Sequence, residues 1–458
     1  MARRVAVIGG GVSGLAAAYR LRTLLGDAAT ITVLESTGSL GGKLRTAELA
    51  GRRYDVGAEA FLARRPEAIA LIEEIGLAGE LTHPTAARST VRAGGRRVAL
   101  PGGTLMGVPG SVGAVADVLS DAGRATVAAE GDLPPVSLGG EDVALGPLLR
   151  ERFGDELVDR LVDPLLGGVY AGGSDSLGLR ATVPALASAL DKGAGSLTSA
   201  AASLLPASPS RAPVFGTLTS GLGTLVDRLV ELAKPDIRLD APVRALHRLP
   251  TGWRLEAGPD VLEADSVVLA VPAPAARRLL EGVAPDASAA LGEVELASMA
   301  VVALALPPGT ELPDASGVLI AAGERHADGT PFAAKAFTFS SRKWSHLDGG
   351  PVFVRGSVGR FGEPGALRAA DEELVRLVRA DLAELTGITA EPVDVLVTRW
   401  GGGLPQYGVG HLDLVGRVER AVAAVPGLAI TGAVLHGVGV PACVATADAA
   451  AARIAGVP

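Results

Sequence analysis

The chain has 458 residues, a formal net charge of −8 and a single cysteine, Cys443. This length suits two or three domains, and the negative charge argues against general nucleic-acid binding. One cysteine excludes an internal disulfide and a cysteine-rich metal site, and the six histidines show no metal-ligand spacing, so we expect no metal.

Hydrophobic residues make up 48% of the chain, but glycine, proline or charge interrupts every apolar run. None reaches the roughly 18 residues that a transmembrane helix needs. Arginines at positions 3 and 4 lead directly into the first predicted strand, without the apolar core of a signal peptide. We therefore expect a cytoplasmic protein with no transmembrane segment and at most peripheral contact with a membrane.

The first predicted element is a dinucleotide-binding unit. Residues 5–8 are continuously apolar, as in a buried parallel strand. Gly9, Gly11 and Gly14 then follow the spacing G-x-G-x-x-G, and an alanine-rich helix begins. The next strand, TITVLE, ends in Glu35, at the roughly 20-residue distance expected of an acidic residue that binds a ribose. A strand–helix turn without a ligand is the alternative, and this context favours an adenine dinucleotide.

A second glycine turn comes directly after Glu35. Gly41 and Gly42 precede the basic residues Lys43 and Arg45, and a strand at 54–56 runs into another small-residue loop. Proline near its start and glycine near its end predict a helix over about 66–81.

The remaining elements follow in chain order. We predict a hairpin at 94–95 and then a helical insertion over about 109–210 with a flexible, Ser/Ala/Pro-rich exit. Strands near 237–243, 253–257 and 265–271 are expected to belong to the nucleotide sheet. A strand-rich domain over about 297–395, with a helix near 369–386, comes next, and the chain ends in a strand–glycine loop–helix unit whose helix begins near Pro441.

Two glycine turns at opposite ends of the chain, each followed by a helix start, suit a long cofactor. One helix N-terminus can face a pyrophosphate, and the other can stabilise negative charge on a reduced flavin. A nicotinamide enzyme does not need the second turn, so FAD is favoured.

The motifs VAVIGGGVSGLAAAYRL, GSLGGKLRT, PLLGGVYAGGSDSLGLRATVPAL and LPQYGVGH resemble those of the protoporphyrinogen and coproporphyrinogen oxidases. The likeness is greatest to the soluble bacterial, coproporphyrin-forming branch and runs along the whole chain. The sequence departs from the family pattern at Gly173, where an acidic residue is usual, and at the glycine-rich run 401–403.

The resemblance implies an α/β plus α+β fold: an FAD-binding, Rossmann-like domain of the hydroxybenzoate-hydroxylase type, a mixed-sheet substrate domain and an inserted helical domain. The expected limits are 1–85, 215–296 and 396–458 for the FAD-binding domain, 86–108 and 297–395 for the substrate domain, and 109–214 for the helical domain.

The resemblance also implies which residues hold the FAD. They are Gly9, Gly10, Gly11, Val12, Ser13, Gly14, Glu35, Gly42, Lys43, Gly57, Ala58, Glu59, Ala60, Val243, Trp400, Val438, Gly439 and Val440. Val243 can equally be an ordinary strand residue, and Trp400 can serve core packing. No tethering residue is evident, since Cys443 has no visible partner, so we expect the FAD to be non-covalent.

The implied reaction oxidises a porphyrinogen to a porphyrin with molecular oxygen as final acceptor and hydrogen peroxide as product. The sequence identifies no catalytic acid or base, and His83, His411 and His436 are interpreted as structural. Arg64 and Arg65 are the predicted contacts of the substrate propionates, with solvated charges as the alternative. Weaker candidates of the same kind are Lys335, Arg342 and Lys343.

Coproporphyrinogen III, with four propionates, is the expected substrate, and a ferrochelatase is the expected receiver of the product. Protoporphyrinogen IX is the first alternative substrate. A flavin amine oxidase is a second alternative, disfavoured because aromatic residues form only 3% of the chain. A non-catalytic binder of the GDP-dissociation-inhibitor type is a third, disfavoured by the intact phosphate loop.

Overall fold

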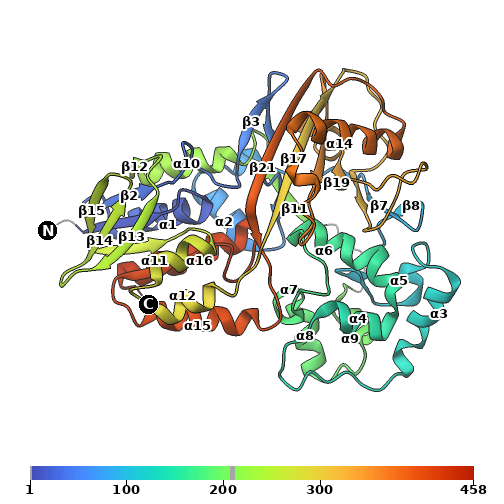
Figure 1. Cartoon of the computed structure of the whole chain (residues 1–458), viewed down its shortest axis with the longest axis horizontal. Coiled ribbons are helices and arrows are strands. Elements are labelled where there is room, and N and C mark those ends of the chain that lie inside the picture. Colours follow the sequence, from blue (N-terminus) through green and yellow to red (C-terminus); the bar gives the residue numbers. More distant parts are fainter. Residues whose placement is uncertain (1–2, 207–211, 458) are drawn as a thin grey trace.

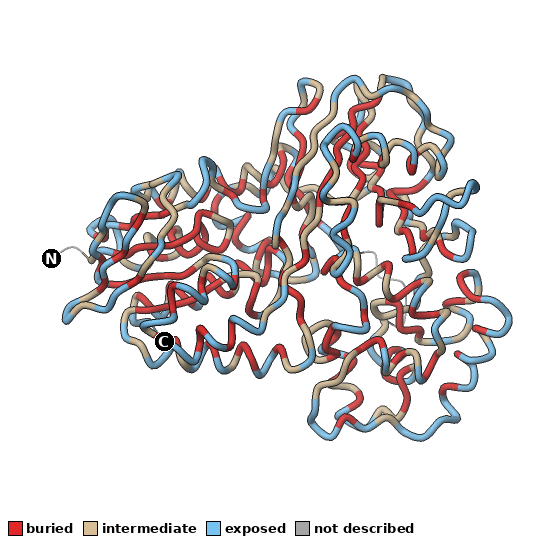
Figure 2. Tube along the Cα trace, in the orientation of Figure 1, coloured by how far each residue is buried: buried red, intermediate tan, exposed pale blue. Residues whose placement is uncertain are grey.

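The computed structural model describes residues 3–206 and 212–457 and has three parts. In Figure 1 a parallel sheet with its helices fills the left half, a large mixed sheet lies at upper right, and a group of helices lies at lower right. Figure 2 shows buried segments inside each part. Each part therefore has a hydrophobic core of its own.

Five parallel strands form the sheet on the left, in the order β12-β2-β1-β16-β22. The inner strands are apolar and buried along almost their whole length, as parallel strands covered on both faces must be. Ile8 pairs with Leu34, so the turn after β1 and the residue after β2 meet at one edge. The strands are β12 (Asp236–Arg238), β2 (Thr30–Leu34), β1 (Arg4–Ile8), β16 (Ser266–Leu269) and β22 (Leu428–Ile430).

Four helices lie on one side of this sheet and share its core. They are α1 (Val12–Leu25), α2 (Pro66–Glu74), α10 (Gly223–Ala233) and α16 (Val440–Ala455). Helices α1 and α16 pack on the strands, α10 packs on α1, and α2 packs on α16. The start predicted for α16 is confirmed. The helix predicted over 66–81 is shorter than expected, because Gly76 adopts a φ of +79° and only a single short turn, Ala78–Glu80, follows.

The opposite face carries an antiparallel sheet and three helices around a second core. These elements are β13 (Val243–Arg248), β14 (Trp253–Ala257), β15 (Asp260–Ala264), α11 (Ala273–Leu280), α12 (Pro285–Leu291) and α15 (His411–Ala423). The strand predicted over 237–243 is wrong in its extent. Asp240 has a φ of +50° and precedes Pro242 by two residues, so the chain turns there and β13 begins a separate sheet.

A seven-stranded sheet at upper right has the order β21-β17-β20-β19-β18-β7-β8, and helix α14 (Asp371–Thr386) packs on it. The strands are β21 (Asp394–Pro405), β17 (Leu296–Leu306), β20 (Val352–Val358), β19 (Ala334–Thr338), β18 (Gly317–Ile320), β7 (Ser89–Ala93) and β8 (Arg96–Ala99). The hairpin predicted at 94–95 and the helix predicted near 369–386 are confirmed.

The domain boundary expected between 395 and 396 needs correction, because it falls inside β21. This strand pairs with β17 from Asp394 to Pro405 without leaving the sheet. Alternation of polar and apolar residues is weak in its glycine-rich second half, so no local pattern indicates that the strand continues.

Helices occupy most of the insertion at lower right and enclose a core of their own. They are α3 (Asp121–Ala129), α4 (Leu145–Phe153), α5 (Asp155–Leu157), α6 (Asp163–Tyr170), α7 (Leu179–Thr182), α8 (Pro184–Asp191) and α9 (Leu197–Leu204). The flexible exit predicted for this insertion falls largely on 207–211, outside the described residues. Strand β11 (Phe215–Leu218) returns the chain by pairing with β5 (Phe61–Leu62) and β6 (Leu81–Thr82).

Candidate functional site: a dinucleotide cradle

The turn between β1 and α1 has two glycines that the fold requires and one that it does not. A Cβ at Gly9 would overlap the carbonyl oxygen of Ala270, and one at Gly14 would overlap the carbonyl oxygen of Gly9. A Cβ at Gly11, in contrast, would meet only the Cα of Gly42, at 4.0 Å. The missing side chain of Gly11 therefore leaves an accessible stretch of backbone at the start of α1.

The second glycine turn lies against the first. Gly41 N–H donates to the carbonyl oxygen of Gly10 at 2.8 Å, and Gly42 has a φ of +56°. A Cβ at Gly42 would stand 3.2 Å from the Cα of Gly11. Both turns are thus bare where they face each other, and Lys43 follows at once. Part of the Lys43 surface is exposed to solvent. The protein packed around its ammonium group nevertheless reduces solvation of the positive charge, and this lowers the pKa of Lys43.

Glu35 is fixed at the end of β2 by the same turn. Its Oε2 accepts a hydrogen bond from Gly10 N–H at 2.8 Å, and its Oε1 accepts one from Thr37 N–H at 2.9 Å. The backbone oxygen of Glu35 accepts from Ala241 N–H at 2.8 Å, which brings the start of β13 beside it. Val243 begins that strand, half-buried against the second core. It lies next to the Glu35 loop and also serves packing.

Two helix N-termini point free N–H groups at this region. Helix α1 begins at Val12 with Gly11 as its N-cap, and α16 begins at Val440 with Gly439 as its N-cap; neither cap has a side-chain hydrogen bond. The two helices pack against each other. Uncapped N–H groups and the positive end of the helix dipole favour an anionic ligand. Val438, just before this N-cap, packs on the core of the helical part.

The loop 57–60 is held between Lys43 and Trp400. A Cβ at Gly57 would overlap the carbonyl oxygen of Lys43 and lie 3.2 Å from Trp400 Cζ2. Ala58 N–H donates to Lys43 O at 2.9 Å, and Trp400 Nε1–H donates to the carbonyl oxygen of Val56 at 3.3 Å. Trp400, on β21, thus joins the seven-stranded sheet to the glycine turns. Ala60 is partly buried beside Tyr54 and Val56.

Glu59 has a structural role that the sequence did not indicate. Its Oε1 lies 2.6 Å from Lys343 Nζ and its Oε2 lies 3.5 Å from the Arg355 guanidinium. Burial alone would raise the pKa of Glu59, but the two cations outweigh it and hold the pKa below its usual range. Arg355 also donates to the carbonyl oxygens of Asp55 and Gly57, at 3.1 and 2.9 Å. The Glu59 side chain therefore ties the loop to the seven-stranded sheet.

These features fit a dinucleotide. The bare face at Gly11 and Gly42 admits a pyrophosphate to the backbone at the N-terminus of α1, and the uncapped N-terminus of α16 remains for a second anionic part of the ligand. Glu35 stands where a ribose hydroxyl would be bound, with acceptor capacity left on Oε2.

Comparisons with known proteins agree with this interpretation. Residues 12–455 match the family model described as flavin containing amine oxidoreductase. The coproporphyrinogen III oxidase of Mycobacterium tuberculosis (strain H37Rv) is 45% identical over 99% of this chain and 97% of its own length. The enzyme of the same name from Bacillus subtilis is 31% identical over 98% of this chain and 97% of its own length.

The chain belongs to this flavin oxidoreductase family. A solved structure from Exiguobacterium sp. 255-15, described as a candidate protoporphyrinogen oxidase, superimposes with a TM-score of 0.88 at 32% identity and covers 99% of both chains. The resemblance drawn from the sequence motifs is thereby confirmed, as is an FAD-binding α/β fold. A flavin is the cofactor that the family indicates.

Within this flavin oxidoreductase the remaining α1 and α16 residues serve packing as well. Val12 is partly buried, and Ser13 is buried near the Cys443 thiol. Cys443 is free and buried, and burial raises the pKa of its thiol. This environment makes it a poor nucleophile.

The three histidines singled out in the sequence all have structural partners. His83 Nδ1 lies 2.9 Å from the carbonyl oxygen of Phe215, and His436 Nε2 lies 2.7 Å from Glu419 Oε1. His411 is buried, and its Nε2 lies 3.1 Å from the carbonyl oxygen of Leu435. In the described part of the chain no cluster of side chains could hold a metal.

The two arginines predicted to bind substrate lie just before α2 and differ in environment. Arg64 is exposed, whereas Arg65 pairs with Glu67 at 2.7 Å. Gly437, in the loop before α16, lies close enough that its Cβ would come 3.8 Å from Arg65 Nη1. Arg65 therefore lies beside the loop that precedes α16, and the carboxylate of Glu67 already neutralises part of its positive charge.

The three weaker candidates for binding a propionate differ in their partners and in their burial. Lys343 is committed to Glu59, and Arg342 is exposed, 4.0 Å from Asp314. Lys335 is buried on β19, and the sequence did not indicate its neighbour Arg360. The motif FVRGSVGR contains both Arg355 and Arg360, and two arginines within one apolar strand pattern are the signal that could have directed attention there.

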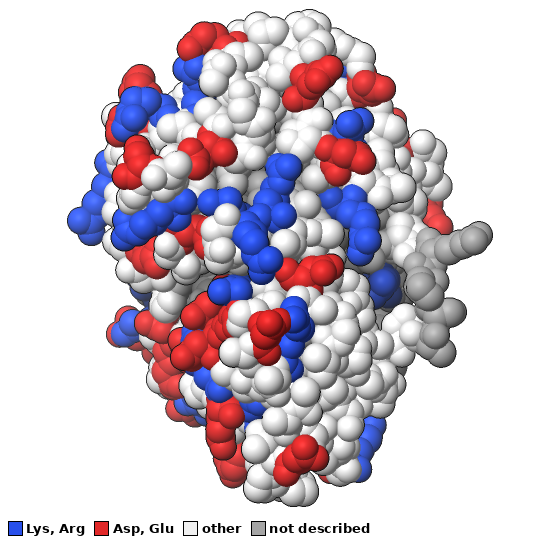
Figure 3. Space-filling view, turned by 90° about the vertical axis from the view of Figure 1, so that its right-hand side faces the viewer, with Lys and Arg blue, Asp and Glu red and all other residues white. Residues whose placement is uncertain are grey.

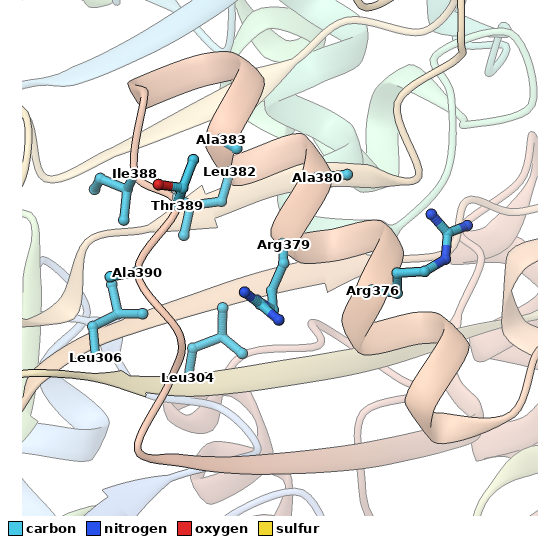
Figure 4. A pocket seen from close by; sticks show the side chains of 10 residues that line it. All are labelled: Leu304, Leu306, Arg376, Arg379, Ala380, Leu382, Ala383, Ile388, Thr389 and Ala390. Carbon is cyan, nitrogen blue, oxygen red and sulfur yellow. The ribbon is translucent and has the colours of Figure 1, made fainter.

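A cavity of about 280 Å³ lies elsewhere, between α14 and the seven-stranded sheet (Figure 4). Its floor is apolar, with Leu304 and Leu306 of β17, and Arg376 and Arg379 stand at one side. Both arginines are paired with carboxylates, Glu373 and Glu391. None of the residues lining the cavity belongs to the glycine turns.

Proposed function

We propose that this chain is an FAD-dependent oxidase that converts coproporphyrinogen III to coproporphyrin III, with molecular oxygen as acceptor and hydrogen peroxide as product. The observation that carries the proposal is the likeness, over nearly the full length, to relatives named coproporphyrinogen III oxidase. The intact glycine turn with Glu35 supports it, because a binder without redox chemistry does not need this turn.

The reaction removes six electrons and six hydrogens from the macrocycle, so three oxidation cycles consume three molecules of oxygen and release three of hydrogen peroxide. FAD, when bound, supplies the hydride acceptor. The chain contributes binding and orientation: the glycine turns hold the dinucleotide, and the Glu59–Lys343–Arg355 cluster fixes the loop 57–60 against the sheet. No acid or base is assigned among the histidines.

The finer structural expectations belong to the same proposal. The flavin part takes the hydroxybenzoate-hydroxylase form. The expected limits 215–296, 297–395 and 396–458 are moved to the start of β17 and the end of β21, so the flavin part spans 1–85, 215–295 and 406–458. The substrate part spans 86–108 and 296–405, and the helical part 109–214. Cytoplasmic location and transfer of the product to a ferrochelatase are also proposed. No helix of the described residues is both long and apolar enough to cross a membrane.

The cofactor makes a first prediction. The protein will purify yellow, and denaturation with acid or heat will release all of the flavin as FAD, because Cys443 is buried and no other tether is evident. Chromatography of the supernatant after precipitation will identify it. Flavin that stays with the precipitated polypeptide would contradict non-covalent binding.

The substrate makes a second prediction. kcat/KM will be at least about tenfold higher for coproporphyrinogen III than for protoporphyrinogen IX, since additional carboxylates can add charge-assisted hydrogen bonds of about 1.5–3 kcal/mol each. Porphyrin fluorescence follows both reactions. A preference for protoporphyrinogen IX would replace the assignment and would agree with the description of the Exiguobacterium neighbour as a candidate protoporphyrinogen oxidase.

Arg65→Ala extends the same measurement to the residues proposed for substrate binding, Arg64 and Arg65. The variant will raise KM for coproporphyrinogen III more than for protoporphyrinogen IX. The effect will be modest, about two- to fivefold, because Arg65 is half-exposed and Glu67 already neutralises it in part. An equal change for both substrates would mean that Arg65 does not bind the additional carboxylates.

A further inference from the structure

Lys335 is a buried lysine at an irregularity of the seven-stranded sheet. It lies on β19, and only 6% of its surface is exposed. Ala334 pairs with Val358 and Ala336 with Ser357, so Lys335 is an extra residue with no partner of its own on β20. Such bulges redirect a side chain. Without the bulge, Lys335 would share the face of Phe337, which packs toward α14.

The ammonium group of Lys335 has no partner among the described residues. No hydrogen bond or ion pair reaches its Nζ, although Asp381 of α14 is close in the fold and accepts hydrogen bonds from Ala333 and Ala334 N–H groups at 2.9 and 2.7 Å. The Nζ is not among the fully enclosed polar atoms that lack a partner, so it keeps access to solvent. A buried cation in this state is costly, and burial lowers the pKa of Lys335 to about 7.

Arg360 brings a second cation to the same place. It follows β20 and donates from Nη2 to the carbonyl oxygen of Ile320, at 2.8 Å, at the end of β18. Because β19 lies between β20 and β18, this guanidinium crosses β19. It crosses near Lys335, since Leu319 pairs with Ala336. No carboxylate of the described residues lies within 4.0 Å of the guanidinium; Glu363, Asp163 and Asp381 act on it from farther away.

The surroundings of the pair leave room on one side. Helix α6 packs against β18 and β19, and Figure 1 shows it where the helical part meets the seven-stranded sheet. The face of α6 is bare here: a Cβ at Gly168 would reach only Leu319, at 3.7 Å, and one at Gly167 would meet nothing within 4 Å.

The pair also lies within reach of the flavin side of the sheet. Thr338, three residues from Lys335 on β19, pairs with Arg355, which holds the carbonyl oxygen of Gly57. Three residues of strand span roughly 10 Å. Figure 3 shows Lys and Arg side chains in a band across the middle of the face where the sheet and the helical part meet. Such a band favours the approach of an anion to a chain of negative net charge.

We propose that Lys335 and Arg360 form a subsite for a carboxylate of the substrate, which under the proposed function, on which this inference rests, is a propionate of coproporphyrinogen III. Two cations without a carboxylate partner match a single carboxylate with its two oxygens. Arg360 is held in place by Ile320, and Lys335 supplies the more mobile donor. This subsite is separate from Arg64 and Arg65, which belong to the loop before α2.

The test compares binding of porphyrins by the FAD-loaded protein. Coproporphyrin III, the tetracarboxylate product, and its tetramethyl ester are titrated while porphyrin fluorescence is followed. Lys335→Met will weaken coproporphyrin III binding at least about tenfold and leave the ester unchanged, because the ester offers no negative charge. Lys335→Arg will restore most of the binding. Lys192→Met, which alters an exposed lysine in the helical part, is the matched control and will bind as wild type.

Turnover separates this inference from the proposed function. If the wild type oxidises coproporphyrinogen III and Lys335→Met raises KM at least about tenfold with little change in kcat, both hold. If the wild type turns over and Lys335→Met binds coproporphyrin III as tightly as the wild type, the subsite is refuted and the function stands. If the wild type binds coproporphyrin III through Lys335 without oxidising the porphyrinogen, the function fails and the subsite stands. Wild-type protein that does neither overturns both.

Discussion

Gly11→Val will fold like the wild type and purify without flavin. Gly11 has φ −75° and ψ 178°, extended values that valine adopts readily, and its Cβ would lie 4.0 Å from the nearest atom, Gly42 Cα. The branched side chain will occupy the space through which a pyrophosphate approaches the N–H groups of α1. Losing two charge-assisted hydrogen bonds of about 1.5–3 kcal/mol each lowers FAD affinity at least about a hundredfold.

Absorbance near the flavin bands measures the loss, and circular dichroism with thermal melting measures the fold. The variant will have the same melting temperature as wild-type protein from which the flavin has been removed. The flavin-free wild type is the proper reference, because a bound ligand itself stabilises the holoprotein. Gly14→Ala is the matched control with the opposite outcome. Its Cβ would overlap the Gly9 carbonyl oxygen, so this variant will lose stability even without flavin. A yellow Gly11→Val protein would show that the pyrophosphate lies elsewhere.

The dinucleotide site formed by the two glycine turns and Glu35 could be predicted because each of its parts depends on residues that are close in the sequence. Gly9, Gly11 and Gly14 lie within six consecutive positions, and Glu35 follows after one helix and one strand. Strand, turn and helix each have a short-range pattern, so the sequence indicates both the unit and its ligand. The apolar periodicity of α14 and the glycines of the β7–β8 hairpin were informative for the same reason.

Features that depend on pairing between distant segments could not be predicted. Glu59 looked like a loop residue beside a flavin, but its partners Lys343 and Arg355 lie nearly 300 positions later. The extent of β21 depends on pairing with β17, and the break at Asp240 depends on a backbone conformation that asparagine, aspartate and glycine share. The bulge at Lys335 has no sequence signature, because only the register of β19 against β20 reveals the extra residue.

Lys335→Met will stabilise the protein at neutral and acidic pH. The folded-state pKa of Lys335 is about 7, depressed by burial and then by Arg360, against an ordinary value of 10.5. Between these two pH values the unfolded chain binds a proton that the native chain lacks. The lysine therefore does not lower the free energy of unfolding through its charge above pH 10.5. This destabilisation grows as pH falls and reaches its full size below pH 7. At about 1.4 kcal/mol for each unit, the upper limit is about 5 kcal/mol.

Methionine fills a similar volume without the charge, so it removes this cost. We expect the free energy of unfolding to rise by about 2–4 kcal/mol at pH 6 and by clearly less at pH 9.5, measured by urea unfolding of the flavin-loaded proteins. Lys343→Met is the contrasting variant. It removes the 2.6 Å partner of Glu59 and leaves Arg355 as the remaining cation beside that carboxylate, so it will destabilise by about 3 kcal/mol.

The sign of the Lys335→Met effect decides between two roles for the residue. If Lys335 stabilised the fold, its replacement would lower the free energy of unfolding at every pH. A lysine kept for an anionic ligand opposes folding until that ligand arrives, so its replacement raises stability while weakening carboxylate binding. Coproporphyrin III at saturating concentration will therefore narrow the stability gap between wild type and variant, because the ligand stabilises the wild type more. A gap that the porphyrin leaves unchanged would mean that the cation at β19 does not bind it.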